Sequence, residues 1–238
     1  LERFRPVNHP AQQLGTPPSQ GGANLLPLAK GEHSREAREG VAKPYILFVG
    51  TRDMRKNVPL LIRAFARICE DLPHQLVIAG RTALKSAATE EEEEDRKQAR
   101  ELGLQERIMW LNFVPDEDLP VLHAGADLFV WPSAYEGWGL PPMEAMASGV
   151  PVIVSNGGAL PEVVGSAGEI VPFSKQKLRE RTWDMPFEEV LASRMLAVLE
   201  DENKRRTMRQ LGIEQVKQFS WRSVAEKTLQ VYKKVAGV

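Results

Sequence analysis

Two glutamates, Glu136 and Glu144, flank a glycine-rich turn that runs into the start of a predicted helix. The first backbone N–H groups of a helix have no partner within it, and the helix dipole favours an anion such as a phosphate there. Gly137 and Gly139 lack a Cβ atom, so a ligand can approach the backbone closely. Carboxylates repel a phosphate unless they bind another group of the ligand. Sugar hydroxyls are the obvious partners for them. The stretch therefore predicts a site for a ligand with phosphates in its middle and polyols at its ends, such as a sugar nucleotide.

A second candidate for ligand binding is the basic pair Arg55 and Lys56, which follows a predicted strand ending at Gly50. The segment matches neither the Walker motif nor the G-x-G-x-x-G pattern. Both cations stand at a predicted helix start, where the helix dipole disfavours positive charge. Two adjacent cations there suit a diphosphate ligand. The alternative is an exposed basic pair on a helix end, and the motif by itself does not decide between the two.

The elements that must position these residues alternate from residue 45 onward. Apolar runs predict strands over 45–49, 75–79, 108–111, 127–131, 152–154 and 169–171. Helical spacing predicts helices over 58–71, 90–102, 116–123, 143–148, 188–200, 203–218 and 220–235. Repeated alternation predicts a parallel sheet covered on both faces, with ligands at the carboxyl ends of its strands. The acidic run 90–95 is typical of a solvated face or loop end, suits a helix N-terminus, and is assigned no chemistry.

Composition excludes several classes of function. The 31 basic and 32 acidic residues nearly cancel, so no charge excess indicates nucleic-acid binding. No apolar run approaches the roughly 18 residues of a membrane span. The single cysteine, Cys69, excludes an internal disulfide, fits a reducing compartment and is interpreted as a small core residue. The four histidines show no metal-ligand spacing, so we expect no zinc site.

The stretch from Pro132 to Val154 closely resembles the signature of glycosyltransferase family 4, which comprises retaining enzymes of the GT-B fold that use nucleotide-sugar donors. The resemblance continues through 155–165 and 167–172. It also includes 49–57 and 219–221, and it extends over roughly residues 44 to 238. It implies an α/β fold with a Rossmann-like, doubly wound parallel sheet that forms one half of a GT-B enzyme.

The resemblance also predicts the domain organisation. Residues 44–238 would form the nucleotide-sugar-binding domain. Residues 1–43, rich in Pro, Gly, Gln and Ser, would be an interdomain linker remnant with an irregular insertion. The opening residues 1–6 resemble the end of the family's linker, so we expect the acceptor-binding domain to lie upstream, outside this chain. This chain alone should bind donor without turning it over.

The resemblance implies roles for individual residues, and Arg81 is a further candidate because it directly follows the predicted strand end at Gly80. Glu136 would contact the donor sugar, and Glu144 would hold the ribose hydroxyls. Lys56 matches the family's phosphate-binding lysine, whereas Thr51 stands where the family has a basic residue. Arg55 is the favoured replacement for that charge, with Arg52 as an alternative. The predicted catalytic residues are Glu136, Lys56 and Arg55. The predicted donor-binding residues are Glu144, Gly137, Gly139, Leu140, Gly50, Thr51, Val114 and Arg81, of which Gly139 and Leu140 offer backbone N–H groups and Val114 meets the base.

The resulting hypothesis is a retaining hexosyltransferase that needs neither cofactor nor metal. Its donor would be linked to GDP or UDP, with GDP-mannose favoured by resemblance to bacterial polysaccharide mannosyltransferases. Its acceptor would be a glycan or a lipid-linked glycan, bound through the upstream domain. We expect a cytoplasmic protein, either free or peripheral at the inner membrane face. Two alternatives remain at this point, a sugar-nucleotide 2-epimerase of the same fold and a non-catalytic nucleotide-sugar-binding module.

Overall fold

The computed structural model describes residues 43–80, 90–173 and 185–237. Its centre is a six-stranded parallel sheet in the order β3-β2-β1-β4-β5-β6. The strands are β1 (Tyr45–Val49), β2 (Gln75–Ala79), β3 (Ile108–Leu111), β4 (Leu128–Trp131), β5 (Val152–Ser155) and β6 (Glu169–Val171). Every residue of β1, β4 and β5 is buried, as expected of parallel strands covered on both faces.

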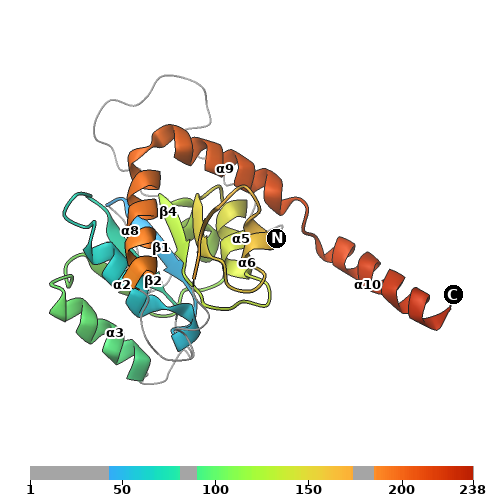
Figure 1. Ribbon diagram of the computed structural model, residues 1–238, viewed down its shortest axis with the longest axis horizontal. Coiled ribbons are helices and arrows are strands. Elements are labelled where there is room, and N and C mark those ends of the chain that lie inside the picture. Colours follow the sequence, from blue (N-terminus) through green and yellow to red (C-terminus); the bar gives the residue numbers. More distant parts are fainter. Residues whose placement is uncertain (1–42, 81–89, 174–184, 238) are drawn as a thin grey trace.

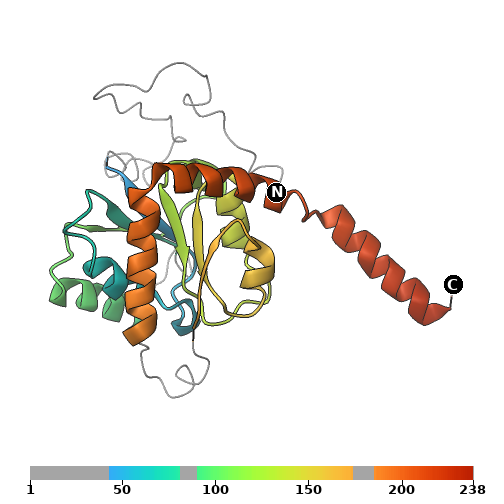
Figure 2. The same cartoon turned by 45° about the horizontal axis from the view of Figure 1, so that its top comes forward.

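Helices cover both faces of the sheet (Figures 1 and 2). They are the 3-10 turn η3 (Met54–Lys56), α2 (Val58–Ala66), α3 (Glu90–Glu101), α4 (Leu119–Ala124), α5 (Leu140–Ala147), α6 (Leu160–Val164), α8 (Met185–Glu200), α9 (Glu202–Val216) and α10 (Trp221–Ala236). Helix α2 contacts α3 and α8, whereas α5 contacts α4, α6 and α9; α8 also contacts α9, which follows it in the chain. This two-layered covering confirms the predicted doubly wound α/β fold.

The six predicted strands are all present, two of them with an end shifted by one residue. The helices deviate more. Helix α2 ends at Ala66 rather than at Asp71, and α4 begins at Leu119 rather than at Asp116. In α4 the cause is Pro120, whose fixed φ angle and missing N–H favour the first helical turn. Sequence periodicity missed η3 and α6, which have three and five residues, because so short an element leaves little periodic pattern.

An ion-pair cluster around the buried Glu188 holds α2 against α8. The Glu188 carboxylate accepts hydrogen bonds from Arg63 Nε and Arg67 Nε, both at 2.7 Å. Charge-assisted hydrogen bonds of this kind compensate for removing the carboxylate from water. The cluster thus ties the C-terminal helices to the first βα unit, which carries the basic pair.

The strand order places a switch point between β1 and β4. Chain connections run outward in opposite directions from these two neighbouring strands, which leaves a crevice outside their carboxyl ends. The loop after β1 spans residues 50–57, and the loop after β4 spans residues 132–139. The two segments singled out from the sequence therefore meet at the position where open α/β sheets bind ligands.

Helix α10 projects away from the sheet and its covering helices (Figures 1 and 2). None of its side chains is buried, and Trp221, Tyr232 and Val235 are 74%, 67% and 82% exposed. Among the described residues, nothing covers these three apolar side chains of α10.

Candidate functional site at the sheet switch point

The centre of the site is an ion pair between Lys56, from the loop after β1, and Glu136, from the loop after β4. Lys56 Nζ lies 2.5 Å from Glu136 Oε1, and the two side chains are 12% and 14% exposed. Partial burial strengthens such a pair compared with one on the surface, because less water screens it. Each side chain still reaches solvent, so a ligand in the crevice can contact both.

Local hydrogen bonds determine where Lys56 stands. Asp53 caps η3 by accepting a hydrogen bond from Arg55 N at 3.0 Å. Asn57 follows with a left-handed φ of 54°, which asparagine tolerates better than most residues. Its buried amide donates to Pro132 O at 2.8 Å, which ties the end of η3 to the loop after β4. Lys56 is therefore presented from a short, capped turn that is anchored on both sides.

The two loops are also joined through Arg55, whose backbone oxygen accepts two hydrogen bonds. One comes from Ala134 N at 2.7 Å and the other from Ser133 Oγ at 3.2 Å. Because these bonds cross from the β1 loop to the β4 loop, the spacing between Lys56 and Glu136 is held by the backbone as well as by the ion pair.

A third loop, after β5, supports Glu136 from beneath. Glu136 forms an isolated parallel bridge with Gly158, and its carbonyl accepts a hydrogen bond from Ala159 N at 2.9 Å. Gly158 has φ of +64°, and a Cβ atom there would collide with Glu136 O. Only glycine combines this φ angle with so close an approach at little cost. The loop 132–139, called the signature loop below, therefore packs directly against the backbone of the loop after β5.

Helix α5 begins behind this loop with Gly139 as its N-cap residue, at φ 112°. Pro141 and Pro142 have no N–H, so Gly139 and Leu140 supply the backbone donors at this helix end. Those two N–H groups donate to no other described residue. Glu144 lies half-buried within α5, one turn beyond the helix start. The helix terminus therefore offers two backbone donors for an anion, fewer than a terminus without prolines would.

Other predicted residues lie around the pair in less direct positions. The Arg55 guanidinium is exposed and bonded to Asp53, with Nε 3.2 Å from Oδ1. Thr51 is exposed and donates to the same carboxylate at 3.4 Å. Gly137 is exposed on the signature loop, and Val114 is half-buried beyond β3. Arg81 lies outside the described residues, as does almost all of the predicted linker 1–43.

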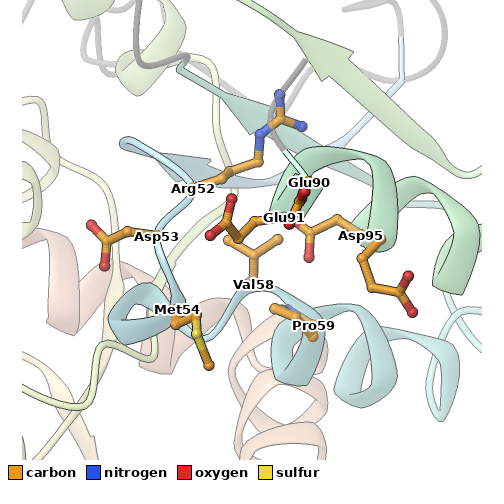
Figure 3. A pocket seen from close by; sticks show the side chains of 9 residues that line it. Arg52, Asp53, Met54, Val58, Pro59, Glu90, Glu91 and Asp95 are labelled. Atoms are coloured by element: carbon orange, nitrogen blue, oxygen red, sulfur yellow. The ribbon is translucent and has the colours of Figure 1, made fainter.

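Arg52 lies on the other side of the β1 loop, facing α3. Its guanidinium is 2% exposed, lies 3.1 Å from Glu92 Oε1 and sits over the Trp110 ring at 5.2 Å. In Figure 3 the Arg52 side chain points away from Met54. This residue lines a separate cavity of about 390 Å³ between the β1 loop and the starts of α2 and α3.

Two carboxyl groups of the acidic run are buried there rather than solvated. Glu92 and Asp95 are 1% and 2% exposed. Burial raises the pKa of Asp95 to about 7, against the attraction of Arg52 and with the added repulsion of Glu92 and its acidic neighbours. The helical period places residues three apart on one face of α3, here the inward face. The expectation of a solvated face is thus wrong at these two positions.

We expect Asp95→Asn to stabilise the chain increasingly as the pH rises from 5 to 8. The native carboxyl holds its proton up to about pH 7, whereas the unfolded one releases it near 3.8, so the parent loses stability across that window. The asparagine variant does not titrate, and its relative gain should reach roughly 1–3 kcal/mol. Urea denaturation of the parent and the variant at pH 5 and at pH 8 measures this difference in the free energy of unfolding. Glu101→Gln, at the exposed last residue of α3, is the control, and a gain from Asp95→Asn that is independent of pH contradicts the expectation.

Four residues that contribute to this site were not predicted from sequence patterns. Asn57 ends the segment 49–57, and the tolerance of asparagine for a left-handed turn could have indicated its role. Gly157 and Gly158 lie under the signature loop, where their pairing indicated a close backbone approach. Trp131 closes β4 and lies under Lys56. For the tryptophan no sequence signal existed, because a buried aromatic residue at a strand end is typical of ordinary packing.

Within the described ranges, no group of three or more His, Cys, Asp or Glu side chains is placed to hold a metal ion. No described helix is long and apolar enough to cross a membrane.

Comparison with known proteins shows the family to which the chain belongs. Residues 30–215 match the family model described as "Glycosyl transferases group 1". The O-antigen chain mannosyltransferase B of Escherichia coli is 33% identical over 237 residues, which covers 98% of this chain and 57% of that protein. The chain spans about half the length of the curated relatives that it matches.

Solved structures show the same fold. Sucrose-phosphate synthase from Thermosynechococcus elongatus matches with a TM-score of 0.67 at 29% identity, over 83% of this chain and 46% of that one. The Anabaena protein HepE, solved in complex with UDP and glucose, matches with a TM-score of 0.67 at 23% identity, over 87% and 52% of the two chains.

Proposed function

Because this chain belongs to the glycosyl transferases group 1 family, we propose that it is the donor-binding domain of a retaining, family 4 hexosyltransferase. The observation that carries the proposal is the Lys56–Glu136 pair at the switch point, beside the start of α5. A cation, a carboxylate and two backbone donors converge there, which matches the alternating charge and hydroxyl groups of a nucleotide sugar.

The diphosphate is assigned to the cationic side of the site. Lys56 would contact the phosphates directly, and the N–H groups of Gly139 and Leu140 would donate to them from the end of α5. Arg55 would add a second positive charge once its exposed guanidinium leaves Asp53, a surface pair that costs little to break. Gly137, Gly50 and Thr51 would line the approach to the phosphates.

The two glutamates are assigned to hydroxyl groups at opposite ends of the donor. Glu136, next to Lys56, would bind the sugar, and Glu144, one turn inside α5, would bind the ribose. The base would meet backbone groups near Val114, beyond the carboxyl end of β3. A carboxylate accepts hydrogen bonds from hydroxyls strongly, which gives this placement its physical basis.

In the transfer step, the bond between the anomeric carbon and the β-phosphate oxygen breaks, and its electron pair leaves with the diphosphate. The acceptor hydroxyl oxygen forms the new bond on the same face of the sugar, and its proton passes to the oxygen of the leaving diphosphate. Lys56, Arg55 and the α5 donors stabilise the charge that develops on the leaving diphosphate, and such electrostatic stabilisation is often the largest single contribution to catalysis. The acceptor, a glycan or lipid-linked glycan, would be bound by a domain outside this chain.

For the donor we propose GDP-mannose. Support comes from the mannosyltransferase that matches 98% of this chain at 33% identity. We further propose that the full-length enzyme acts in the cytoplasm, either free or peripheral at the inner membrane face. Calorimetric titration of this chain with GDP-mannose, UDP-glucose and UDP-GlcNAc tests the donor, and GDP-mannose should bind tightest. Failure of all three to bind would overturn the donor-binding function, whereas tighter binding of a UDP-sugar would overturn only the choice of donor.

Donor binding should be independent of divalent metal ions. Lys56, Arg55 and the start of α5 can neutralise the diphosphate without one. Titrations in EDTA and in millimolar Mg²⁺ should therefore yield the same dissociation constant at matched ionic strength. A loss of affinity in EDTA that Mg²⁺ restores is the contrary result.

A further inference from the structure

Beneath Lys56 lies the indole ring of Trp131, the last residue of β4. Lys56 Nζ stands 4.5 Å from the centre of the ring, over its face. Attraction between an ammonium and the negative face of an aromatic ring acts over about 6 Å and is strongest for tryptophan. The Lys56 side chain is only 12% exposed, so the ring replaces part of the water that the ammonium has lost.

The ring is itself packed against neighbouring aromatic side chains. It stacks on Phe48 of β1 at 4.9 Å between centroids and on Phe129 of its own strand at 6.0 Å, both with interplanar angles of 18°. Trp131 is 1% exposed. A Cβ atom at Gly50 would stand 2.5 Å from Trp131 Cη2, so the absence of a side chain at Gly50 makes room for the ring. Neighbouring residues therefore enclose the Trp131 ring beneath Lys56.

The indole N–H does not account for a tryptophan at this position. Trp131 Nε1 is buried and has no hydrogen-bond partner among the described residues. An unpaired buried donor is unfavourable, and a purely apolar residue would avoid that cost. Trp131 contacts the Lys56 ammonium through the face of its ring and not through its N–H.

We propose that Trp131 is a positioning residue that holds the Lys56 ammonium at the switch point. The ring supports the ammonium from one side while Glu136 Oε1 accepts one hydrogen bond at 2.5 Å. An ammonium has three N–H donors, so others remain for an anion in the crevice. This inference rests on the proposed function, because it gives Lys56 the role of contacting the donor diphosphate.

The test compares Trp131→Phe with Trp131→Leu. Both shorten a buried side chain and lose packing, but only phenylalanine keeps an aromatic face. Calorimetric titration with GDP should show a roughly three- to tenfold weaker affinity for Trp131→Leu and a smaller loss for Trp131→Phe. In a Lys56→Met background the two variants should bind GDP equally, because a residue acting through Lys56 has no effect once Lys56 is gone.

A ligand-free measurement separates this inference from the proposed function. The ε-CH₂ protons of Lys56, assigned by their loss in Lys56→Met, should show an upfield ring-current shift that persists in Trp131→Phe and disappears in Trp131→Leu. Absence of that shift in the parent chain overturns the positioning role, as does a phenylalanine–leucine difference that survives in Lys56→Met. If the shift is present and Lys56→Met binds GDP normally, the positioning of Lys56 stands and the phosphate role of Lys56 fails.

Discussion

Replacing Glu136 by glutamine should reduce sugar transfer by the full-length enzyme about 10²–10³-fold, the usual cost of removing one preorganised electrostatic contact. Glutamine keeps the size of the side chain but loses the charge that would stabilise the positive character developing on the sugar. Nucleotide binding should survive and even strengthen. In the unliganded protein the carboxylate lies 2.5 Å from Lys56 Nζ, so it competes with a diphosphate for that ammonium. Turnover at saturating donor and GDP affinity by calorimetry measure the two effects separately.

Glu144→Gln is the matched comparison, with the same chemical change on α5. If Glu144 binds the ribose, its replacement should weaken GDP binding and lower turnover mainly through donor affinity. An exchange of the two phenotypes would mean that the donor lies in the opposite direction along the signature loop. Weaker GDP binding by Glu136→Gln would contradict the competition between Glu136 and the diphosphate.

Replacing Lys56 by methionine should weaken GDP binding at least tenfold. A hydrogen bond to a charged group contributes roughly 1.5–3 kcal/mol, and about 1.4 kcal/mol corresponds to a tenfold change in affinity. The loss should exceed that minimum, because without Lys56 the Glu136 carboxylate remains beside the phosphates unpaired. The double variant Lys56→Met with Glu136→Gln should therefore bind GDP better than Lys56→Met alone. Calorimetry on the four proteins of this cycle yields the coupling between the two side chains.

Lys97→Met is the control for a general effect of charge. Lys97 is 55% exposed on α3 and pairs only with its neighbour Glu94 among the described residues, so its loss should leave GDP affinity unchanged. GDP binding by Lys56→Met at parental affinity would remove Lys56 from the phosphate site. It would also remove the observation on which the proposed function depends.

Much of the fold could be predicted because parallel strands buried on both faces leave a continuous apolar run. The run Tyr45–Val49 is such a strand, and all five of its residues are buried. The carboxyl ends of the strands could be located in the same way, and with them the loops that carry Lys56 and Glu136. Helix ends were less predictable, since capping and proline placement, as at Pro120, shift them by several residues.

The sequence by itself determined the alternating α/β class, the glycine-rich signature loop and the candidate charges, because these depend on local pattern and chain order. Only the tertiary structure decided which charges meet. Lys56 and Glu136 are 80 positions apart and pair because β1 and β4 are neighbours across the switch point. Arg52, only four positions before Lys56, turns to α3 instead. The partner of a charged side chain is set by the strand order and by which groups share a buried space, and neither is encoded within a short stretch of chain.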